Sequence, residues 1–187
     1  ETGGVCAWNM QLAFDEDVTF QATRKIYEYA RHPDDPFCLV VSLTHPHHPF
    51  LVTPEYWEQF DHNEIPEPSV GRLPDSELDA HSERARRLLG VHETDVTSEQ
   101  RRNARHAYFA AIRYVDDKIG TVLGALEATG ASDSTAVFMV SDHGEMLGER
   151  GLWAKDCFFE WAMRIPFLMK LPGDGDRFPA GSGIDFG

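Results

Sequence analysis

The sequence is poor in positive charge and in cysteine. Lys and Arg supply 17 of its 187 residues, against 31 Asp and Glu, so the net charge at pH 7 is −14. No Lys/Arg-rich cluster stands out, and we expect neither a nucleic acid nor a membrane surface as a partner. The three cysteines, Cys6, Cys38 and Cys157, are odd in number and not closely paired. They make no disulfide framework and favour a reducing, cytoplasmic location.

Long apolar runs, internal repeats and low-complexity tracts are also missing. No run is long enough to cross a bilayer, and no signal peptide is visible. The chain does not begin with Met and stops in a loop-like sequence, so we expect both true ends of the protein to lie outside it. Hydrophobic residues nevertheless make up 42% of the sequence, which is enough for a core. We therefore expect one domain, or a large part of a bigger one.

Helical and apolar patterns alternate along the chain. A helix is predicted over residues 15–31, because acidic residues suit its first turn. A second helix is predicted after the capping box at residues 97–100, with an apolar stripe that continues to Leu126. Short apolar runs at 37–43 and 135–140 predict strands buried on both faces. This order predicts an α/β fold with helices packed on a mostly parallel sheet.

A polar segment separates the first predicted strand from the second long helix. Residues 51–96 carry prolines at positions 54, 66, 68 and 74. They predict a long excursion over the surface, with at most one short helix near residues 82–89. Excursions of this length are usually functional or mobile.

Polar side chains follow both predicted strands, at residues 44–50 and at residues 141–145. Ligands of open α/β sheets bind beyond the carboxyl ends of the strands, so the two clusters would converge on one site if their strands are near neighbours. Asp142 and His143 suit a divalent cation, and Gly144 permits the sharp turn that would let both reach it. The dipeptide also fits an Asp that caps a helix beside a surface His.

The longer string around this dipeptide resembles the metal-binding segment of sulfatases. Residues 141–155 are S-D-H-G-E-M-L-G-E-R-G-L-W-A-K, which is similar to the family's S-D-H-G-E-x-L-G followed by W-x-K. Residues 158–167 are similar to the F-x-E and R-x-P segment that follows, residues 45–50 resemble the P-H-x-P-[FY] loop, and residues 114–120 resemble the helix before the last strand. The likeness covers about residues 9 to 172 and is strongest to the choline-sulfatase type within the alkaline phosphatase superfamily. Phosphonate monoester hydrolases share much of the pattern.

The resemblance implies roles for four residues. Asp142 and His143 stand where the family has two ligands of its divalent metal, for which we expect Ca²⁺, with Mg²⁺ or Mn²⁺ as alternatives. Lys155 stands where a lysine contacts the sulfate oxygens. His47 stands where a histidine lies near the leaving-group oxygen. These positions make His47 and Lys155 the candidate catalytic and substrate-binding residues.

Other parts of the family's site have no match in this sequence. None of the cysteines lies in C-x-[PA]-x-R, the motif whose cysteine, or sometimes serine, becomes the formylglycine nucleophile. The further aspartates, the lysine and the histidine that precede this region in the family cannot be placed either. We therefore expect residues 1–187 to be the central part of a single sulfatase catalytic domain, inactive in isolation, with the formylglycine outside it. His45 and His48 have no implied role, and we expect them to structure the loop or lie on the surface.

The implied reaction is hydrolysis of a small-molecule sulfate monoester, choline-O-sulfate, by an enzyme expected to be a homo-oligomer in its full-length form. Two alternatives stay open: a phosphonate or phosphate-ester hydrolase of the same superfamily, and a non-catalytic module that binds a metal or an anion. Trp57, Trp153 and Trp161 could hold a quaternary ammonium by residue type, or they could simply pack in the core.

Overall fold

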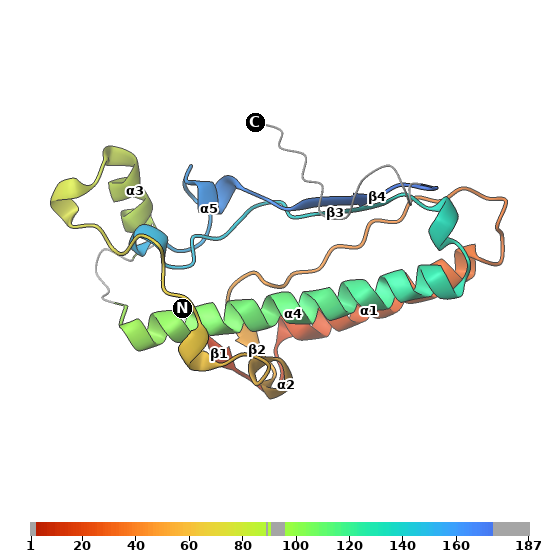
Figure 1. Cartoon of the computed structure of the whole chain (residues 1–187), viewed down its shortest axis with the longest axis horizontal. Helices are drawn as coiled ribbons and strands as arrows, with labels where there is room; N and C mark the ends of the chain where they lie inside the picture. Colours follow the sequence, from red (N-terminus) through yellow and green to blue (C-terminus); the bar gives the residue numbers. More distant parts are fainter. Residues whose placement is uncertain (1–2, 89, 91–95, 174–187) are drawn as a thin grey trace.

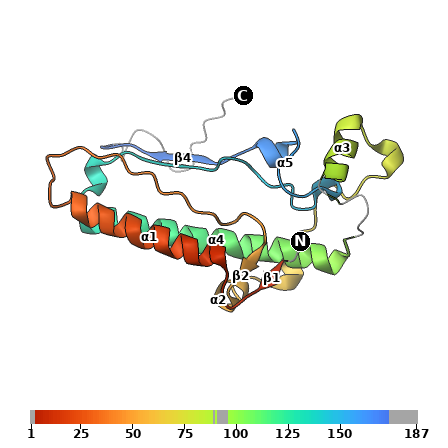
Figure 2. The same ribbon diagram turned by 180° about the vertical axis from the view of Figure 1, so that it is seen from behind.

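The computed structural model describes residues 3–88, 90 and 96–173, and it has a helical layer and an extended layer (Figure 1). The helical layer consists of α1 (Met10–Tyr29) and α4 (Ser98–Ala128), which lie side by side (Figures 1 and 2). The extended layer holds β3 (Val137–Val140) and β4 (Phe167–Lys170), an antiparallel pair. No helix in the described ranges combines the length and the apolar character needed to cross a membrane.

Shorter elements surround the two long helices. A parallel pair of two-residue strands, β1 (Gly4–Val5) and β2 (Leu51–Val52), lies beside α4 (Figure 1). The remaining helical turns are α2 (Pro54–Trp57), η1 (His62–Glu64), η2 (Asp75–Glu77), α3 (Ala80–Leu88), η3 (Ser132–Ser134), η4 (Glu149–Gly151) and α5 (Glu160–Met163). Several of them lie in the predicted excursion over residues 51–96, where α3 coincides with the predicted short helix. Residue 89, the end of that predicted helix, lies outside the described residues.

The predicted second long helix is confirmed as α4. The Thr97 hydroxyl accepts a hydrogen bond from the Gln100 amide, and the Gln100 side chain accepts one from the Thr97 amide, so the capping box is complete. The first long helix begins at Met10, earlier than the predicted residue 15, because the Asn9 side chain caps it by accepting from Leu12 N.

Small side chains on α4 let other segments approach its backbone. Ala107 is fully buried and packs with Phe50 and Leu147, which belong to two different loops. Ala110 packs with Val52 of β2. Since close-packed interiors tolerate little added volume, these alanines fix how near the two loops come to the helix.

The prediction that residues 37–43 and 135–140 are strands buried on both faces is wrong. Residues 37–43 pair with no described strand, and their side chains alternate, with Leu39 packed against the α1–α4 core and Val40 84% exposed. The strand predicted over 135–140 is β3, which begins at Val137 and leaves Phe138 and Val140 exposed. The reason is that each run has packing partners on one face within the described structure, whereas continuous apolar runs predict two.

A stacked aromatic group joins α2 to α4. The rings of Trp57 and His106 are 3.6 Å apart between centroids, and His106 Nε2–H donates to the Trp57 carbonyl at 2.9 Å. Because a carbonyl accepts only, His106 Nδ1 is left as the acceptor for His62 Nδ1, 3.0 Å away. Burial lowers the pKa of His106, so the ring favours this neutral state.

This arrangement predicts an acid-sensitive contribution of His106 to stability. The unfolded chain binds the proton more tightly, so the free energy of unfolding should fall as the pH drops through the ordinary value of 6.5. The His106→Gln variant should lose part of that pH slope in urea unfolding measured between about pH 8 and about pH 5.5. His32→Gln, at an exposed position, is the control. The same slope in both variants would contradict the assignment.

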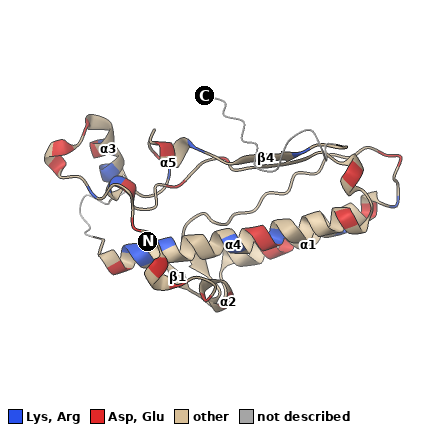
Figure 3. Ribbon diagram, in the orientation of Figure 1, with Lys and Arg blue, Asp and Glu red and all other residues tan. Residues whose placement is uncertain are grey.

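Acidic side chains are spread over most elements, and Lys and Arg are seen on α3 and on the first turns of α4, among other places (Figure 3). On α4, Arg101, Arg102 and Arg105 contact the loops that pack on the helix. Basic side chains are therefore present where the two loops meet α4.

Candidate active site

Two loops far apart in the sequence meet at one place. Lys155 Nζ lies 2.8 Å from His47 Nε2, and the rings of His47 and His143 are 5.9 Å apart between centroids in an edge-to-face arrangement. Asp142 and His143 follow the end of β3, as the sequence predicts, and His143 Nε2 lies 3.8 Å from Asp142 Oδ2. The four predicted site residues are therefore brought together.

The hydrogen bonds of His47 define which of its two ring nitrogens carries a hydrogen. Its Nδ1 lies 2.8 Å from the His48 carbonyl, which accepts only, so Nδ1 carries a hydrogen. Its Nε2 then presents a lone pair and accepts from the Lys155 ammonium. Because an ammonium group only donates, the hydrogen between the two nitrogens belongs to Lys155 in this arrangement.

His143 is prepared to act as a metal ligand in the same way. Its Nδ1–H donates to the Gly144 carbonyl at 2.7 Å, which leaves the Nε2 lone pair facing the Asp142 side. A hydrogen bond from the second ring nitrogen is the usual outer partner of a ligating histidine. The Asp142 side chain is 88% exposed, so its carboxylate is open to a cation.

The pair fits a divalent cation as part of a ligand set. Two donor atoms 3.8 Å apart can share one ion, since ligand bonds are about 2.0–2.6 Å long. Among the described residues, no group of three or more His, Cys, Asp or Glu side chains is placed to hold a metal ion. Asp142 and His143 would therefore supply two ligands and need others beside them.

Helix α1 holds the His47 loop through a buried carboxylate. Asp15 has no exposed surface and accepts four hydrogen bonds: from the Thr44 amide and hydroxyl at 2.6 and 2.7 Å, and from the His45 amide and Nδ1 at 3.0 and 2.7 Å. Burial by itself would raise the pKa of Asp15, but the hydrogen bonds from His45 and Thr44 outweigh it and hold that pKa below its ordinary value.

One helical turn earlier, Gln11 extends this support to His47 itself. Gln11 Nε2 donates to the carbonyls of His47 and His48 at 3.1 and 3.0 Å. The His48 carbonyl also accepts from His47 Nδ1. Gln11 therefore fixes the group that sets the tautomer of His47, and both supports come from the same face of α1.

A second carboxylate shapes the loop that carries Lys155. Glu145 Oε1 accepts from the amides of Leu147 and Ala154 at 3.1 and 2.7 Å. Both of these residues have left-handed backbone angles, with φ of 48° and 60°, which cost on the order of 1 kcal/mol or more each. Gly144 is required at the start of the loop, because a Cβ there would lie 2.1 Å from the Trp161 carbonyl oxygen.

Three of these supporting residues were not singled out from the sequence. The sequence places Asp15 in the first turn of a helix, yet Leu12, Thr19 and Ala22 flank it at helical spacing on the buried face. A carboxylate on an otherwise buried face signals a long-range partner, which is how Asp15 could have been found. Gln11 gives no such signal, because its partners are backbone carbonyls distant in the sequence. Glu145 gives none either, because it accepts from two amides of its own loop, which leave no pattern in the sequence.

The three candidate tryptophans lie in different surroundings. Trp57 stacks on His106 and packs against the cluster that holds Phe50 and Leu147, and Trp161 is more than half exposed on α5. Trp153 packs against the same cluster, and its ring lies 6.3 Å, between centroids, from that of Phe50, whose ring is the same distance from that of His48. Trp153 is therefore connected to the His47 loop through Phe50.

The fold and the two loops define a class of protein. The sulfatase family model matches residues 6–177, and the chain belongs to the sulfatase family. It is 41% identical to a choline-sulfatase of Rhizobium meliloti over 91% of this chain and 34% of that protein, and 29% identical to an arylsulfatase of Clostridium perfringens over 77% of this chain and 29% of that protein. The chain spans about a third of the length of these relatives.

Solved structures give the same result for the fold. A phosphonate monoester hydrolase from Silicibacter pomeroyi superposes with a TM-score of 0.63 at 29% identity, covering 71% of this chain and 28% of that one. The predicted α/β class and the resemblance to the alkaline phosphatase superfamily are thereby confirmed. The roles implied for His47, Asp142, His143 and Lys155 stay predictions.

We predict that the Asp15 carboxylate makes a large contribution to stability. The Asp15→Asn variant keeps the size of the side chain but removes the charge that accepts from His45 and Thr44. Its free energy of unfolding should fall by about 3 kcal/mol in urea, the cost typical of breaking a buried charged network. Asp17→Asn, at an exposed position of the same helix, should change it by less than about 0.5 kcal/mol. Equal losses in the two variants would show that Asp15 does not hold the loop.

Proposed function

We propose that the protein hydrolyses a sulfate monoester, with choline-O-sulfate as its substrate, and that this chain is the central part of its catalytic domain. The observation that carries the proposal is the 2.8 Å hydrogen bond between Lys155 and His47 beside Asp142 and His143, in a chain of the sulfatase family. The high identity to a choline-sulfatase supports the choice of substrate.

Lys155 would stabilise the charge of the transferred group. A sulfate monoester carries negative charge on its oxygens, and charge shifts among them as the ester bond breaks. An ammonium held by a hydrogen bond to His47 is already oriented, so it does not have to reorganise when the charge moves. Lys155 would therefore contact the sulfate in the ground state and more strongly in the transition state.

His47 would be the acid for the leaving group. Choline departs as an alkoxide, a poor leaving group that needs a proton as the ester bond breaks. His47 Nε2 accepts from Lys155 at rest, and it would take up a proton from water when the Lys155 ammonium turns to the sulfate oxygens. The imidazolium would then give that proton to the departing alkoxide and return to the neutral ring, while Lys155 keeps its charge.

The divalent cation of the family would be held in part by Asp142 and His143, and when bound it would neutralise charge on the sulfate oxygens. We expect Ca²⁺ from the resemblance, with Mg²⁺ or Mn²⁺ as alternatives. The other ligands and the formylglycine nucleophile are expected outside this chain. The free state of the three cysteines supports the proposed cytoplasmic location.

The alternative is hydrolysis of a phosphonate or phosphate ester. The superposition on a phosphonate monoester hydrolase favours it, since the two structures share this part of the fold. The whole enzyme's turnover of choline-O-sulfate against an aryl phosphonate separates the two reactions. Faster turnover of the phosphonate would make the sulfatase proposal wrong.

Leaving-group dependence tests the roles of His47 and Lys155 in the whole enzyme. His47→Ala should lower the rate of choline-O-sulfate hydrolysis by about 10²–10⁴-fold, the usual range for general acid catalysis. It should lower the rate of hydrolysis of an activated aryl sulfate far less. Lys155→Ala should lower both rates, because the same charged group is transferred from both substrates. His32→Ala is the exposed control. Equal losses on both substrates for His47→Ala would exclude it from protonating the leaving group.

A further inference from the structure

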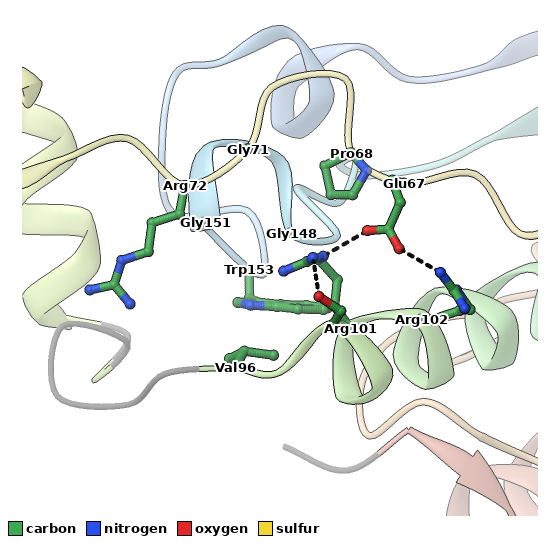
Figure 4. A pocket seen from close by; sticks show the side chains of 11 residues that line it. Glu67, Pro68, Gly71, Arg72, Val96, Arg101, Arg102, Gly148, Gly151 and Trp153 are labelled. Atoms are coloured by element: carbon green, nitrogen blue, oxygen red, sulfur yellow. Dashed lines mark hydrogen bonds and ion pairs between the residues drawn. The ribbon is translucent and has the colours of Figure 1, made fainter.

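A concave site lies beside the loop that carries Lys155, and none of the four predicted site residues is in its lining. It is a cavity of about 470 Å³ between residues 67–72, residues 148–153 and the first turns of α4 (Figure 4). Trp153 lies in it between Arg72 and Arg101 (Figure 4). Its loop belongs to the G-E-R-G-L-W string, which the proposed reaction leaves without a chemical role.

The lining of this cavity is basic in an acidic protein. Its charged residues are Arg72, Arg101, Arg102 and a single carboxylate, Glu67. Glu67 accepts from Arg101 Nε at 2.9 Å and from Arg102 Nη2 at 3.3 Å, so one negative charge serves two guanidinium groups. The α4 N-terminus, which begins at the same place, adds positive potential.

One guanidinium donor at this cavity has no acceptor. Arg102 Nε is buried, and no described residue accepts a hydrogen bond from it. Nε itself has no surface that a ligand could reach, but the Arg102 side chain as a whole is 33% exposed and lines the cavity, so a ligand would meet the exposed part of it. The guanidinium fork suits the two oxygens of a carboxylate, sulfonate or sulfate group.

The walls of the cavity are fixed in place. The Glu149 carboxylate accepts from the amides of Ser69 and Val70 at 2.7 and 2.9 Å, and the Arg150 amide donates to the Val70 carbonyl at 2.7 Å. From α4, Arg105 Nη1 donates to the Leu147 carbonyl at 2.8 Å. A ligand would therefore meet a preformed site and lose less conformational entropy on binding.

Two glycines let the arginine side chains lie against the loop. Gly148 and Gly151 have left-handed φ of 91° and 71°. A Cβ on Gly148 would lie 3.1 Å from Arg101 Cδ, and one on Gly151 would lie 2.9 Å from Arg72 Cγ. The glycines of this string thus position two of the three arginines around the cavity.

We propose that this cavity binds a ring-bearing organic anion, whose acidic group meets Arg101 and Arg102 and whose ring lies on Trp153. The volume exceeds that of a single oxyanion, and an aromatic face beside guanidinium groups suits a flat ring with a charged substituent. Neither His47 nor Lys155 lines the cavity, and the proposal does not depend on the sulfatase reaction proposed above.

Calorimetric titration of the 187-residue protein with benzenesulfonate, which has no ester bond to hydrolyse, tests the proposal. Arg102→Gln should weaken binding by about tenfold, the loss of one charge-assisted hydrogen bond. Glu67→Gln should strengthen it several-fold, because the competing carboxylate is gone while the side-chain size is kept. Arg24→Gln removes the same charge at an exposed position of α1 and should leave the affinity unchanged.

Two further titrations test where the anion binds. Methanesulfonate should bind more weakly than benzenesulfonate, because it has no ring to lie on Trp153. Lys155→Ala should bind benzenesulfonate like the unaltered protein. The proposal is overturned if Arg102→Gln and Glu67→Gln both match Arg24→Gln, or if Lys155→Ala abolishes binding, since the anion would then occupy the site at His47. Circular dichroism of each variant shows that it is folded.

Discussion

The structure depends on the buried carboxylate of Asp15. Without it, the amides of Thr44 and His45 and the His45 ring would lose the carboxylate that accepts from them, and Gln11 alone of the two α1 side chains would still hold the loop that carries His47. The loop that carries Lys155 is held from the other long helix, where Arg105 donates to the Leu147 carbonyl. Because α1 and α4 pack against each other, the two loops share one frame. The short distance between His47 and Lys155 follows from that frame.

Charged side chains at the two loops are paired mainly with backbone groups. The protein carries a net charge of −14, yet the groups that face the site interior are arranged so that backbone amides surround carboxylates and backbone carbonyls surround the basic groups. Glu145 and Glu149 each accept from two amides, and Arg105 donates to two carbonyls, those of Pro66 and Leu147. Burial lowers the pKa of Arg105, with Glu149 acting against the shift. Loops with non-helical backbone are thereby made rigid enough to position side chains.

Sequence reasoning reached the features that depend on local pattern. The capping box and the apolar stripe were sufficient for α4, and two polar clusters after apolar runs were sufficient to place His47 and His143 near each other. It failed where a feature depends on distant partners. The pairing of Val137–Val140 with Phe167–Lys170, the exposure of Val40 and the contact between Asp15 and His45 are set by segments tens of residues away.

The extended layer exposes several apolar side chains, as expected if it packs against parts of the longer protein that this chain does not include. Phe138, Phe167 and Leu168 of the β3–β4 pair and Trp161 of α5 are exposed, and apolar surface of this extent normally contacts other protein. The relatives are about three times as long as the matched region. This supports the proposal that the chain is the central part of a larger catalytic domain.

The central claim is that the two loops meet in a hydrogen bond from Lys155 to a neutral His47. Nitrogen-15 NMR of the imidazole rings in the 187-residue protein tests it most directly. The account predicts a protonated Nδ1 and an unprotonated Nε2 for His47, with the Nε2 resonance shifted in Lys155→Met. A His47 ring protonated at Nε2, or a resonance that Lys155→Met leaves unchanged, would contradict the account.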